Sequence, residues 1–296
     1  MTKWGYCYLT FQYNTHYNII LQHKIMTIIN TYILKMVEYY RQNEINNNTL
    51  TNSNYEELAR RRKEVEAAQE VAKNRGTKVS PNSKVIKDYK AALPINLPFT
   101  VFCVILGSML GDCSVKYDAS KNEASIAFEW GNKEYAYFIY NLLIDYILSP
   151  PREQVRTNAK GNQVVTFCFQ TVKIPAFAIF YHIFINNNVK TIPSGLITYL
   201  MTPLALAIWY MDDGGQTDYR SGHGRGMQIN TQGFTAEAVS QAVVELNEKF
   251  DLNCRVRLIK HRNNQPIIVI PSSSYTKFRN LVRPHMHSSM MYKLPE

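Results

Sequence analysis

The sequence predicts an α+β protein built from two tandem copies of one unit, each running helix, strand, strand, helix, strand, strand, helix (αββαββα). Two observations predict this. Apolar periodicities typical of helices and strands follow one another in that order from residue 81 to residue 296, and similar residues recur at a nearly constant offset. The offset is 101 for three pairs: Asp112/Asp213, Glu129/Asn230 and Phe177/Phe278. Because these matches keep their order along the chain, they indicate an internal duplication.

The first copy is expected over residues 81–197. It begins with an apolar segment that is long enough for a helix and ends in a Gly and Asp turn. A short strand follows, and the next strand alternates apolar and polar residues, as a half-buried strand does. The predicted elements are the helix Pro98–Gly111, the strand Ala124–Trp130, the amphipathic helix Asn132–Leu148, the hairpin Gln154–Thr157 with Gln163–Phe169, and the helix Pro175–Phe184.

The second copy is expected over residues 198–296 and repeats this pattern. Its first helix carries Pro203 at a position that tolerates proline, and its second helix opens with Thr235 and Glu237 in the manner of an N-terminal cap. The predicted elements are the helix Thr202–Asp212, the strand Gly226–Gln232, the helix Thr235–Phe250, the hairpin Cys254–Lys260 with Ile267–Ile270, and the helix Ser273–Val282. Gln154-Val155-Arg156 is matched with Arg255-Val256-Arg257 at offset 101, and Lys190 with Lys293 at 103.

Residues 1–80 differ in composition and are expected to be an N-terminal extension, poorly ordered apart from one charged helix. Asn, Tyr and Ile dominate up to Asn54, after which charged residues take over. The segment Glu56–Ala72 has acidic and basic side chains at helical spacings and few apolar ones, which is typical of a solvated helix.

The net charge favours a polyanionic partner. The chain has 33 Lys and Arg against 23 Asp and Glu, giving a formal charge of +10. Five widely spaced cysteines, without a Cys-x-x-Cys pair, indicate neither a disulfide framework nor a zinc site. The longest apolar run is well short of the ~18 residues that predict a membrane span, so no membrane association is expected.

The sharpest motif is an apolar helix that ends on an aspartate, and it occurs twice: Ile105-Leu-Gly-Ser-Met-Leu-Gly-Asp-Cys113 and Leu206-Ala-Ile-Trp-Tyr-Met-Asp-Asp-Gly214. An acid at a helix C-terminus meets the negative end of the helix dipole and costs a few tenths to about 1 kcal/mol unless a cation offsets it. One such acid is unremarkable. The matched pair, Asp112 and Asp213, suggests a divalent metal site.

These residues resemble the LAGLIDADG homing endonucleases in their single-chain, double-motif form, and within that family the mitochondrial omega-intron type. The resemblance covers residues 81–296. Segments that carry it are Pro81-Asn-Ser-Lys84, Phe128-Glu-Trp130, Leu148-Ser-Pro-Pro151, Lys190-Thr-Ile-Pro193, Trp209-Tyr-Met-Asp-Asp-Gly-Gly215, Asn230-Thr-Gln232, Leu252-Asn-Cys254 and Met290-Met-Tyr-Lys-Leu-Pro295. The chain departs from the family motif in having Leu110 and Met211 for its first acid, Cys113 for its last glycine, and an additional acid, Asp212.

The resemblance implies a pseudo-twofold monomer in which the motif helices pack side by side and two antiparallel sheets form a DNA-binding saddle. Gly107 and Gly111 lie four residues apart, so both face the partner helix and let its backbone approach. The second copy has Ile208 and Asp212 at those positions, which predicts an asymmetric seam of large residues against small ones.

The resemblance also implies roles for six residues. Asp112 and Asp213 would bind Mg²⁺, for which Mn²⁺ would substitute, and the offset of 101 favours Asp213 over Asp212. Lys190 and Lys293 would stabilise developing phosphate charge, while Glu129 and Asn230 would hold waters beneath the metals. DNA would be contacted by strand side chains that point out of the saddle: Lys116, Arg152, Arg156, Lys160, Gln163, Arg220, Arg225, Gln228, Arg255, Arg257, Lys260 and Arg262.

The expected function is cutting of a long, asymmetric double-stranded DNA target by metal-dependent phosphodiester hydrolysis, in support of intron mobility. Two alternatives stay open: an intron RNA maturase, and a catalytically inactive DNA-binding regulator on the same scaffold. Both motif acids are retained, which favours cutting, since RNA binding does not need them. Composition and resemblance together point to a mitochondrial intron product.

Overall fold

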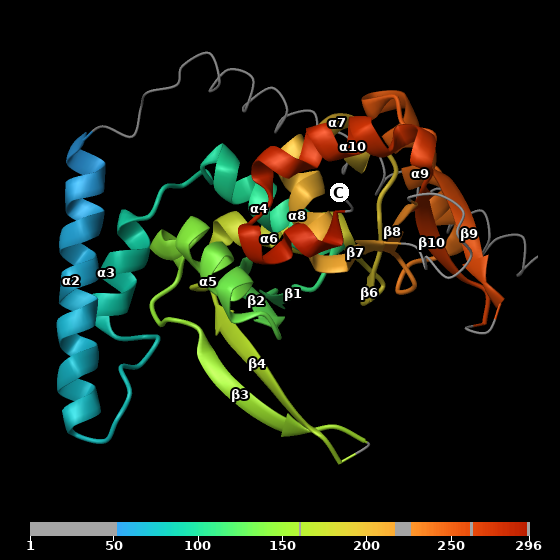
Figure 1. The fold of residues 1–296 in the computed structure, drawn as a ribbon. Coiled ribbons are helices and arrows are strands. Elements are labelled where there is room, and N and C mark those ends of the chain that lie inside the picture. Colours follow the sequence, from blue (N-terminus) through green and yellow to red (C-terminus); the bar gives the residue numbers. More distant parts are fainter. Residues whose placement is uncertain (1–51, 160, 217–225, 261–262, 295–296) are drawn as a thin grey trace, which may run out of the picture. The chain divides into compact units, whose positions relative to one another are not determined.

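Two four-stranded antiparallel sheets of the same topology frame the protein (Figure 1). The computed structural model describes residues 52–159, 161–216, 226–260 and 263–294. The first sheet has the order β1-β2-β4-β3 and the second the order β7-β8-β10-β9. Their strands are β1 (Ser114–Asp118), β2 (Glu123–Trp130), β3 (Arg152–Thr157), β4 (Gln163–Gln170), β7 (Gly214–Gln216), β8 (Met227–Asn230), β9 (Arg255–Ile259) and β10 (Gln265–Ile270). The predicted α+β fold of two tandem units with antiparallel sheets is therefore confirmed.

Helices pack on the buried faces of the sheets. The α-helices are α2 (Asn52–Asn74), α3 (Lys84–Ala92), α4 (Phe99–Leu110), α5 (Lys133–Leu142), α6 (Ala178–Phe184), α7 (Leu196–Leu200), α8 (Pro203–Asp213), α9 (Ala236–Phe250) and α10 (Tyr275–Val282). A two-stranded hairpin, β5 (Ile185–Asn186) with β6 (Val189–Lys190), follows α6, and the 3-10 helix Ser288–Lys293 follows α10. No helix in the described part of the chain is long and apolar enough to cross a membrane.

The central helices α4 and α8 pack against each other at a contact, here called the seam, that leaves no space for a side chain at Gly107 or Gly111. A Cβ added to Gly107 would lie 2.4 Å from the carbonyl oxygen of Ala205 and 2.7 Å from Cβ of Ile208. One added to Gly111 would lie 2.4 Å from Cβ of Asp212. Each glycine therefore faces the residue that occupies its own position in the other copy. The predicted seam of small residues against large ones is confirmed.

The two hairpins differ in length, which corrects the residue matching predicted for them. Glu129 pairs with Cys168, which pairs with Arg152; at the equivalent place in the second sheet Asn230 pairs with Ile267, which pairs with Arg257. The paired residues are thus 16 apart in the first hairpin and 10 apart in the second. Arg257 is the structural counterpart of Arg152 and not of Arg156, because the register of the sheet, and not a constant offset, sets equivalence.

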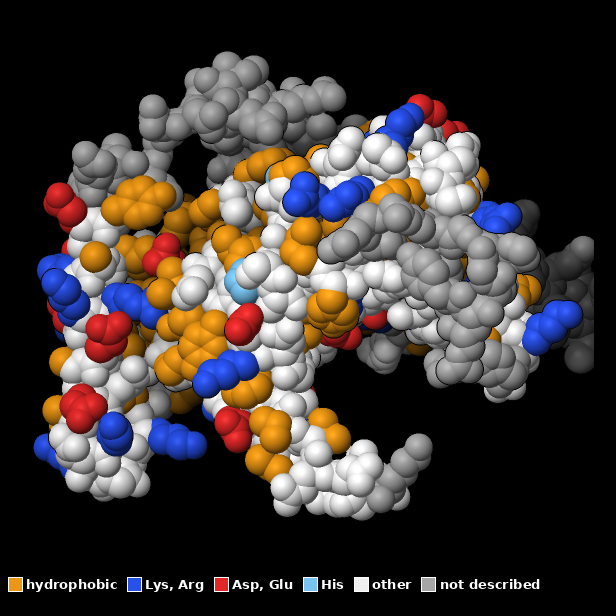
Figure 2. All heavy atoms as spheres, viewed as in Figure 1, with side chains coloured by type: hydrophobic (Ala, Val, Ile, Leu, Met, Phe, Trp, Pro, Cys, Tyr) orange, Lys and Arg blue, Asp and Glu red, His pale blue; other side chains and the backbone are white. Residues whose placement is uncertain are grey.

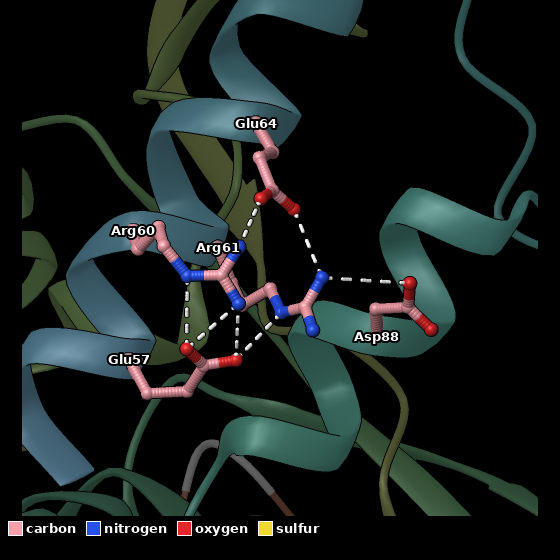
Figure 3. Close-up of polar contacts among 5 residues, drawn as sticks. All are labelled: Glu57, Arg60, Arg61, Glu64 and Asp88. Atoms are coloured by element: carbon pink, nitrogen blue, oxygen red, sulfur yellow. Dashed lines mark hydrogen bonds and ion pairs between the residues drawn. The ribbon is translucent and has the colours of Figure 1, made fainter. Parts of the chain in front are cut away.

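Helix α2 is docked on the protein, although its sequence suggested a solvated helix. Its contacts group it with all later residues in one compact unit, Asn48–Glu296. Of the extension predicted over residues 1–80, residues 1–51 lie outside the described part. Leu58 and Val65 are buried. Acidic and basic side chains alternate along its outer surface (Figure 2). Arg60 and Arg61 share Glu57 and Glu64, and Arg61 also reaches Asp88 of α3, 3.6 Å away (Figure 3).

Docking of α2 and α3 explains why α5 ends earlier than the predicted Leu148. Arg62 donates hydrogen bonds to the carbonyls of Ile144 (2.7 Å) and Ile147 (3.1 Å), and the Tyr89 hydroxyl donates to the carbonyl of Asp145 (2.6 Å). The carbonyl of Ile144 is thereby engaged by α2 and not by a continuing helix, and the chain continues as the single 3-10 turn Ile144–Tyr146.

Candidate active site and nucleic-acid interface

The two aspartates of the repeated motif lie where α4 and α8 end, at the same end of the seam. Asp213 is the last residue of α8, whereas Asp112 lies two residues beyond the last residue of α4. Asp112 keeps access to solvent, but the surrounding protein atoms raise its pKa while Lys293 and Lys190 lower it. Burial, followed by the charge of Asp112, raises the pKa of Asp213 to about 7. The two carboxyl groups thus share a partly buried site in which it is unfavourable for both to be ionised.

Two lysines cover the carbonyl ends of the motif helices. Nζ of Lys190 donates hydrogen bonds to the carbonyls of Gly111 (2.7 Å) and Cys113 (3.3 Å), and Nζ of Lys293 donates to those of Met211 (2.5 Å) and Asp212 (2.8 Å). An ammonium has three donors, and two of them are used on each lysine. Burial lowers the pKa of Lys293, and the three nearby aspartates raise it. The predicted pairing of Lys190 with Lys293 has a clear structural basis.

These lysines change the sequence argument for a metal. From the sequence, a divalent ion was expected to compensate the unfavourable aspartate at each helix C-terminus. In the structure a lysine already supplies a positive charge at each helix end. The argument for a metal therefore depends on Asp112 and Asp213, whose pKa values are both raised. A bound cation would remove the cost of ionising them together.

The residues present suit a metal shared with a substrate. In the described part of the chain no three His, Cys, Asp or Glu side chains form a group that could enclose an ion alone. Mg²⁺ is usually held by one or two carboxylates together with water and substrate phosphates. Two aspartates, one exposed and one half-buried, match that donor set.

Asp212 turns away from this pair. Its Oδ1 accepts hydrogen bonds from Nε1 of Trp130 (3.1 Å) and from the hydroxyl of Tyr135 (2.8 Å), and its Oδ2 accepts one from the backbone amide of Asp112 (3.3 Å). Burial raises the pKa of Asp212 well above its usual value, and the charge of Asp112 raises it further. All its donors come from the first copy and engage both of its oxygens, which favours Asp213 over Asp212 as the metal ligand.

Glu129 and Asn230 occupy equivalent positions on the two sheets. Glu129 accepts hydrogen bonds from Arg156 (2.8 Å) and Thr166 (2.8 Å), and Asn230 accepts from Gln228 (3.3 Å) and Gln232 (3.4 Å). These contacts are with the sheets and not with the aspartates. Both residues are half-buried in their sheets, and their predicted water-holding role stays a prediction.

In the first sheet, strand pairing places basic residues on the face opposite the core, here called the open face. Paired residues share a face, and alternate residues along a strand share it too. Of the predicted DNA-contacting residues, those on the open face with Glu129 are Lys116, Arg152 and Arg156. Gln163 falls on the opposite face at the tip of the β3–β4 hairpin, which projects beyond the helices (Figure 1). Lys160 lies outside the described residues.

The second sheet has a corresponding open face with Asn230. The same register places Gln228, Arg255 and Arg257 on it, and the amide of Gln228 accepts a hydrogen bond from Arg257 (2.9 Å). A hollow of about 680 Å³ opens there, lined in part by Gln228, Asn230, Arg257 and Lys260. Arg220, Arg225 and Arg262 lie outside the described residues.

The sequence did not reveal the hairpin that places Lys190. The turn between β5 and β6 has Asn187 at φ 49° and Asn188 at φ 60°, as a type I′ turn requires, and Asn tolerates this conformation. The adjacent Asn residues were the available signal. Nothing in the sequence indicated that Trp130 and Tyr135 donate to Asp212, because their meeting depends on how the copies pack.

Comparison with known proteins agrees with this geometry. The model of a family described as the LAGLIDADG DNA endonuclease family matches residues 102–278. A "Probable intron-encoded endonuclease 1" of Wickerhamomyces canadensis is 38% identical over 217 residues, 73% of this chain and 92% of that protein. The structure of "the homing endonuclease I-WcaI bound to its DNA recognition sequence" matches with a TM-score of 0.69 and 38% identity, over 73% of this chain and 95% of that one.

A relative with a different name matches less fully. The "Cytochrome b mRNA maturase bI2" of Saccharomyces cerevisiae is 31% identical over 212 residues, which are 68% of this chain but only 48% of the maturase. Similarity to this scaffold therefore extends to a protein named for a role in RNA maturation.

Proposed function

This chain belongs to the LAGLIDADG DNA endonuclease family, and we propose that it cuts both strands of a long, asymmetric DNA target by metal-dependent hydrolysis of one phosphodiester bond in each. One observation carries the proposal. Two aspartates lie together at the ends of paired helices, and a basic open face of a sheet belongs to each copy. A duplex lying along both faces would bring its phosphates to the carboxylates.

The proposed ligands of the metal are Asp112 and Asp213, with Mg²⁺ as the physiological ion and Mn²⁺ as a substitute. Hard carboxylate oxygens suit both ions. When bound, the metal would polarise the scissile phosphate and lower the pKa of an attacking water. The aspartates hold their carboxyl groups close together before any ligand arrives, because α4 and α8 cannot slide apart without losing the glycine contacts at the seam.

Lys190 and Lys293 are proposed to stabilise charge on the phosphates. Each ammonium is fixed by two backbone carbonyls, so its third proton points in a defined direction. Glu129 and Asn230, on the inner strands β2 and β8, are proposed to hold waters beneath the metals. A carboxylate in one copy and an amide in the other would make the two half-sites chemically different.

DNA sequence would be read by the open faces of the sheets. Arg and Gln side chains can address guanine and adenine edges in the major groove, while Lys holds phosphates. The longer β3–β4 hairpin gives the first copy more reach along the duplex than the second. The recognised half-sites would therefore differ in length as well as sequence, and a single chain would suffice to bind both.

We propose that the protein is a mitochondrial intron product. Relatives named as an intron-encoded endonuclease and as a cytochrome b mRNA maturase support this proposal. Cutting an intron-free allele would promote copying of the intron. Binding of intron RNA is the second candidate function, favoured by the maturase relative. The retained aspartates favour cutting, because RNA binding does not require them. An inactive DNA-binding regulator would not need them either.

The test is selection of cleaved sites from a random double-stranded DNA library, with Mg²⁺, with Mn²⁺ and with EDTA. We expect one long, non-palindromic consensus that is cut with either metal and left intact in EDTA. Asp112→Asn serves as the matched control, because it removes one ligand charge without changing side-chain size. Enrichment of bound but uncut DNA would support the regulator, and binding of RNA alone would support the maturase; either result would refute the proposal.

A further inference from the structure

Asp213 and Asp112 are placed by different means. The chain leaves the helical conformation at Gly214 in the second copy (φ −76°, ψ 160°) and already at Gly111 in the first (φ −99°, ψ −128°). Asp213 is therefore a helical residue whose direction is set by α8. Asp112 lies past the end of α4, where helical hydrogen bonds no longer fix the backbone.

The peptide that joins Gly111 to Asp112 is held at both of its polar ends. Its carbonyl oxygen accepts a hydrogen bond from Lys190 (2.7 Å), and its N–H donates one to Oδ2 of Asp212 (3.3 Å). A peptide group held at its carbonyl and at its amide cannot rotate. The backbone orientation at Asp112 therefore depends on Lys190 of its own copy and on Asp212 of the other copy.

Asp212 is itself anchored in the first copy. Trp130 at the end of β2 and Tyr135 in α5 donate to its Oδ1, at 3.1 and 2.8 Å. Gly111 makes room for it, since a Cβ there would lie 2.5 Å from Oδ2. The reverse arrangement does not exist, because the position equivalent to Asp212 in the first copy is this glycine, which has no side chain.

We propose that Asp212 is a positioning residue that fixes the Gly111–Asp112 peptide across the seam. Cutting of the strand served by Asp112 then depends on the second copy. Cutting of the strand served by Asp213 has no such dependence on the first copy. The inference rests on the proposed function for its consequence in cutting. The contact itself can be tested without DNA.

The test uses the full-length protein with Asp212→Asn, which keeps side-chain size. The Asn carbonyl can still accept from Trp130 and Tyr135, but its NH₂ group faces the Asp112 amide, so two donors oppose each other. In Asp212→Asn we expect hydrogen exchange of the Asp112 amide to accelerate at least tenfold, and cutting of one DNA strand to slow at least tenfold more than cutting of the other. Tyr135→Phe removes one of the two donors that anchor Asp212, so it should accelerate the exchange and slow the same strand by a smaller factor. Gly233→Ala, where the added Cβ meets nothing within 4 Å, is the control and should change each rate less than threefold.

Gly111→Ala provides a second variant, because its methyl group displaces the Asp212 carboxylate without removing it. It should produce the same loss for the same strand. Unchanged amide exchange in Asp212→Asn, or equal slowing of both strands, would overturn the inference. If wild-type protein cuts no DNA while the amide responds as expected, the proposed function fails and the positioning contact stands.

Discussion

Replacement of Gly107 by alanine tests the seam that holds the two aspartates together. The added methyl carbon would lie 2.4 Å from the carbonyl oxygen of Ala205 and 2.7 Å from Cβ of Ile208. Ordinary contacts begin at about 3.4 Å, so α4 and α8 must separate by roughly 1 Å. The oxygen belongs to a helix backbone and cannot rotate aside as a long side chain would.

The expected cost follows from two opposing effects. Overpacking of a tight core costs up to about 3 kcal/mol, whereas alanine favours a helix over glycine by about 1 kcal/mol. The free energy of unfolding should therefore fall by about 2 kcal/mol. Cutting should fall further than stability, because a shift at the seam also moves Asp112 relative to Asp213.

Urea denaturation followed by tryptophan fluorescence measures the first effect, since Trp209 is buried in α8. Gly233→Ala is the matched control, because a Cβ there meets nothing within 4 Å; it should leave stability within about 0.5 kcal/mol of wild type. A Gly107→Ala protein as stable as that control, with wild-type cutting, would refute the account of the seam.

Three further variants test other parts of the structure. Burial raises the pKa of Asp213 to about 7, so between pH 4 and 7 the folded protein keeps a proton that the unfolded chain, with a pKa of 3.8, has lost, and stability should fall as the pH rises. In EDTA at pH 8, Asp213→Asn should therefore be more stable than wild type by about 2 kcal/mol, after solvent screening reduces the full effect. Identical pH profiles of the two proteins in urea denaturation would contradict this. Glu245→Ala should lower the free energy of unfolding by about 3 kcal/mol, because the buried carboxylate accepts hydrogen bonds from three backbone N–H groups at the start of α7, including that of Ile197 at 3.0 Å. Thermal denaturation measures this loss, and an unchanged melting temperature would show that these bonds contribute nothing. Arg62→Ala should lose about 2 kcal/mol and expose α2 to limited proteolysis, and equal protease resistance would argue against the docking described.

Much of the architecture could be predicted from the sequence, because it follows from local periodicity and capping. The alternation in β2 and the apolar run of α4 both specify their elements. Thr202 and Thr235 accept hydrogen bonds at the starts of α8 and α9, as N-terminal caps do. The glycine spacing in α4 predicted the close seam, because only a missing side chain permits that approach.

Features that depend on contacts between distant segments could not be predicted. Helix α7 has five residues, too few for a periodic signal. The offset of 101 holds between β2 and β8 but not in the hairpins, because the first hairpin is longer. The extra length could not be predicted, because it leaves the alternation of residues along the strands unchanged. The role of Asp212 depends on Trp130, which is 82 residues away and meets it only through packing.

The central claim is that Asp112 and Asp213 together cut DNA while other residues bind it. The most direct measurement compares wild type, Asp112→Asn and Asp213→Asn on one duplex that carries the selected site, with cutting and binding recorded in the same samples. The account predicts that each variant binds within about threefold of wild type and makes double-strand breaks at least a hundredfold more slowly, a loss of about 3 kcal/mol in transition-state stabilisation. Wild-type cutting by either variant would contradict it.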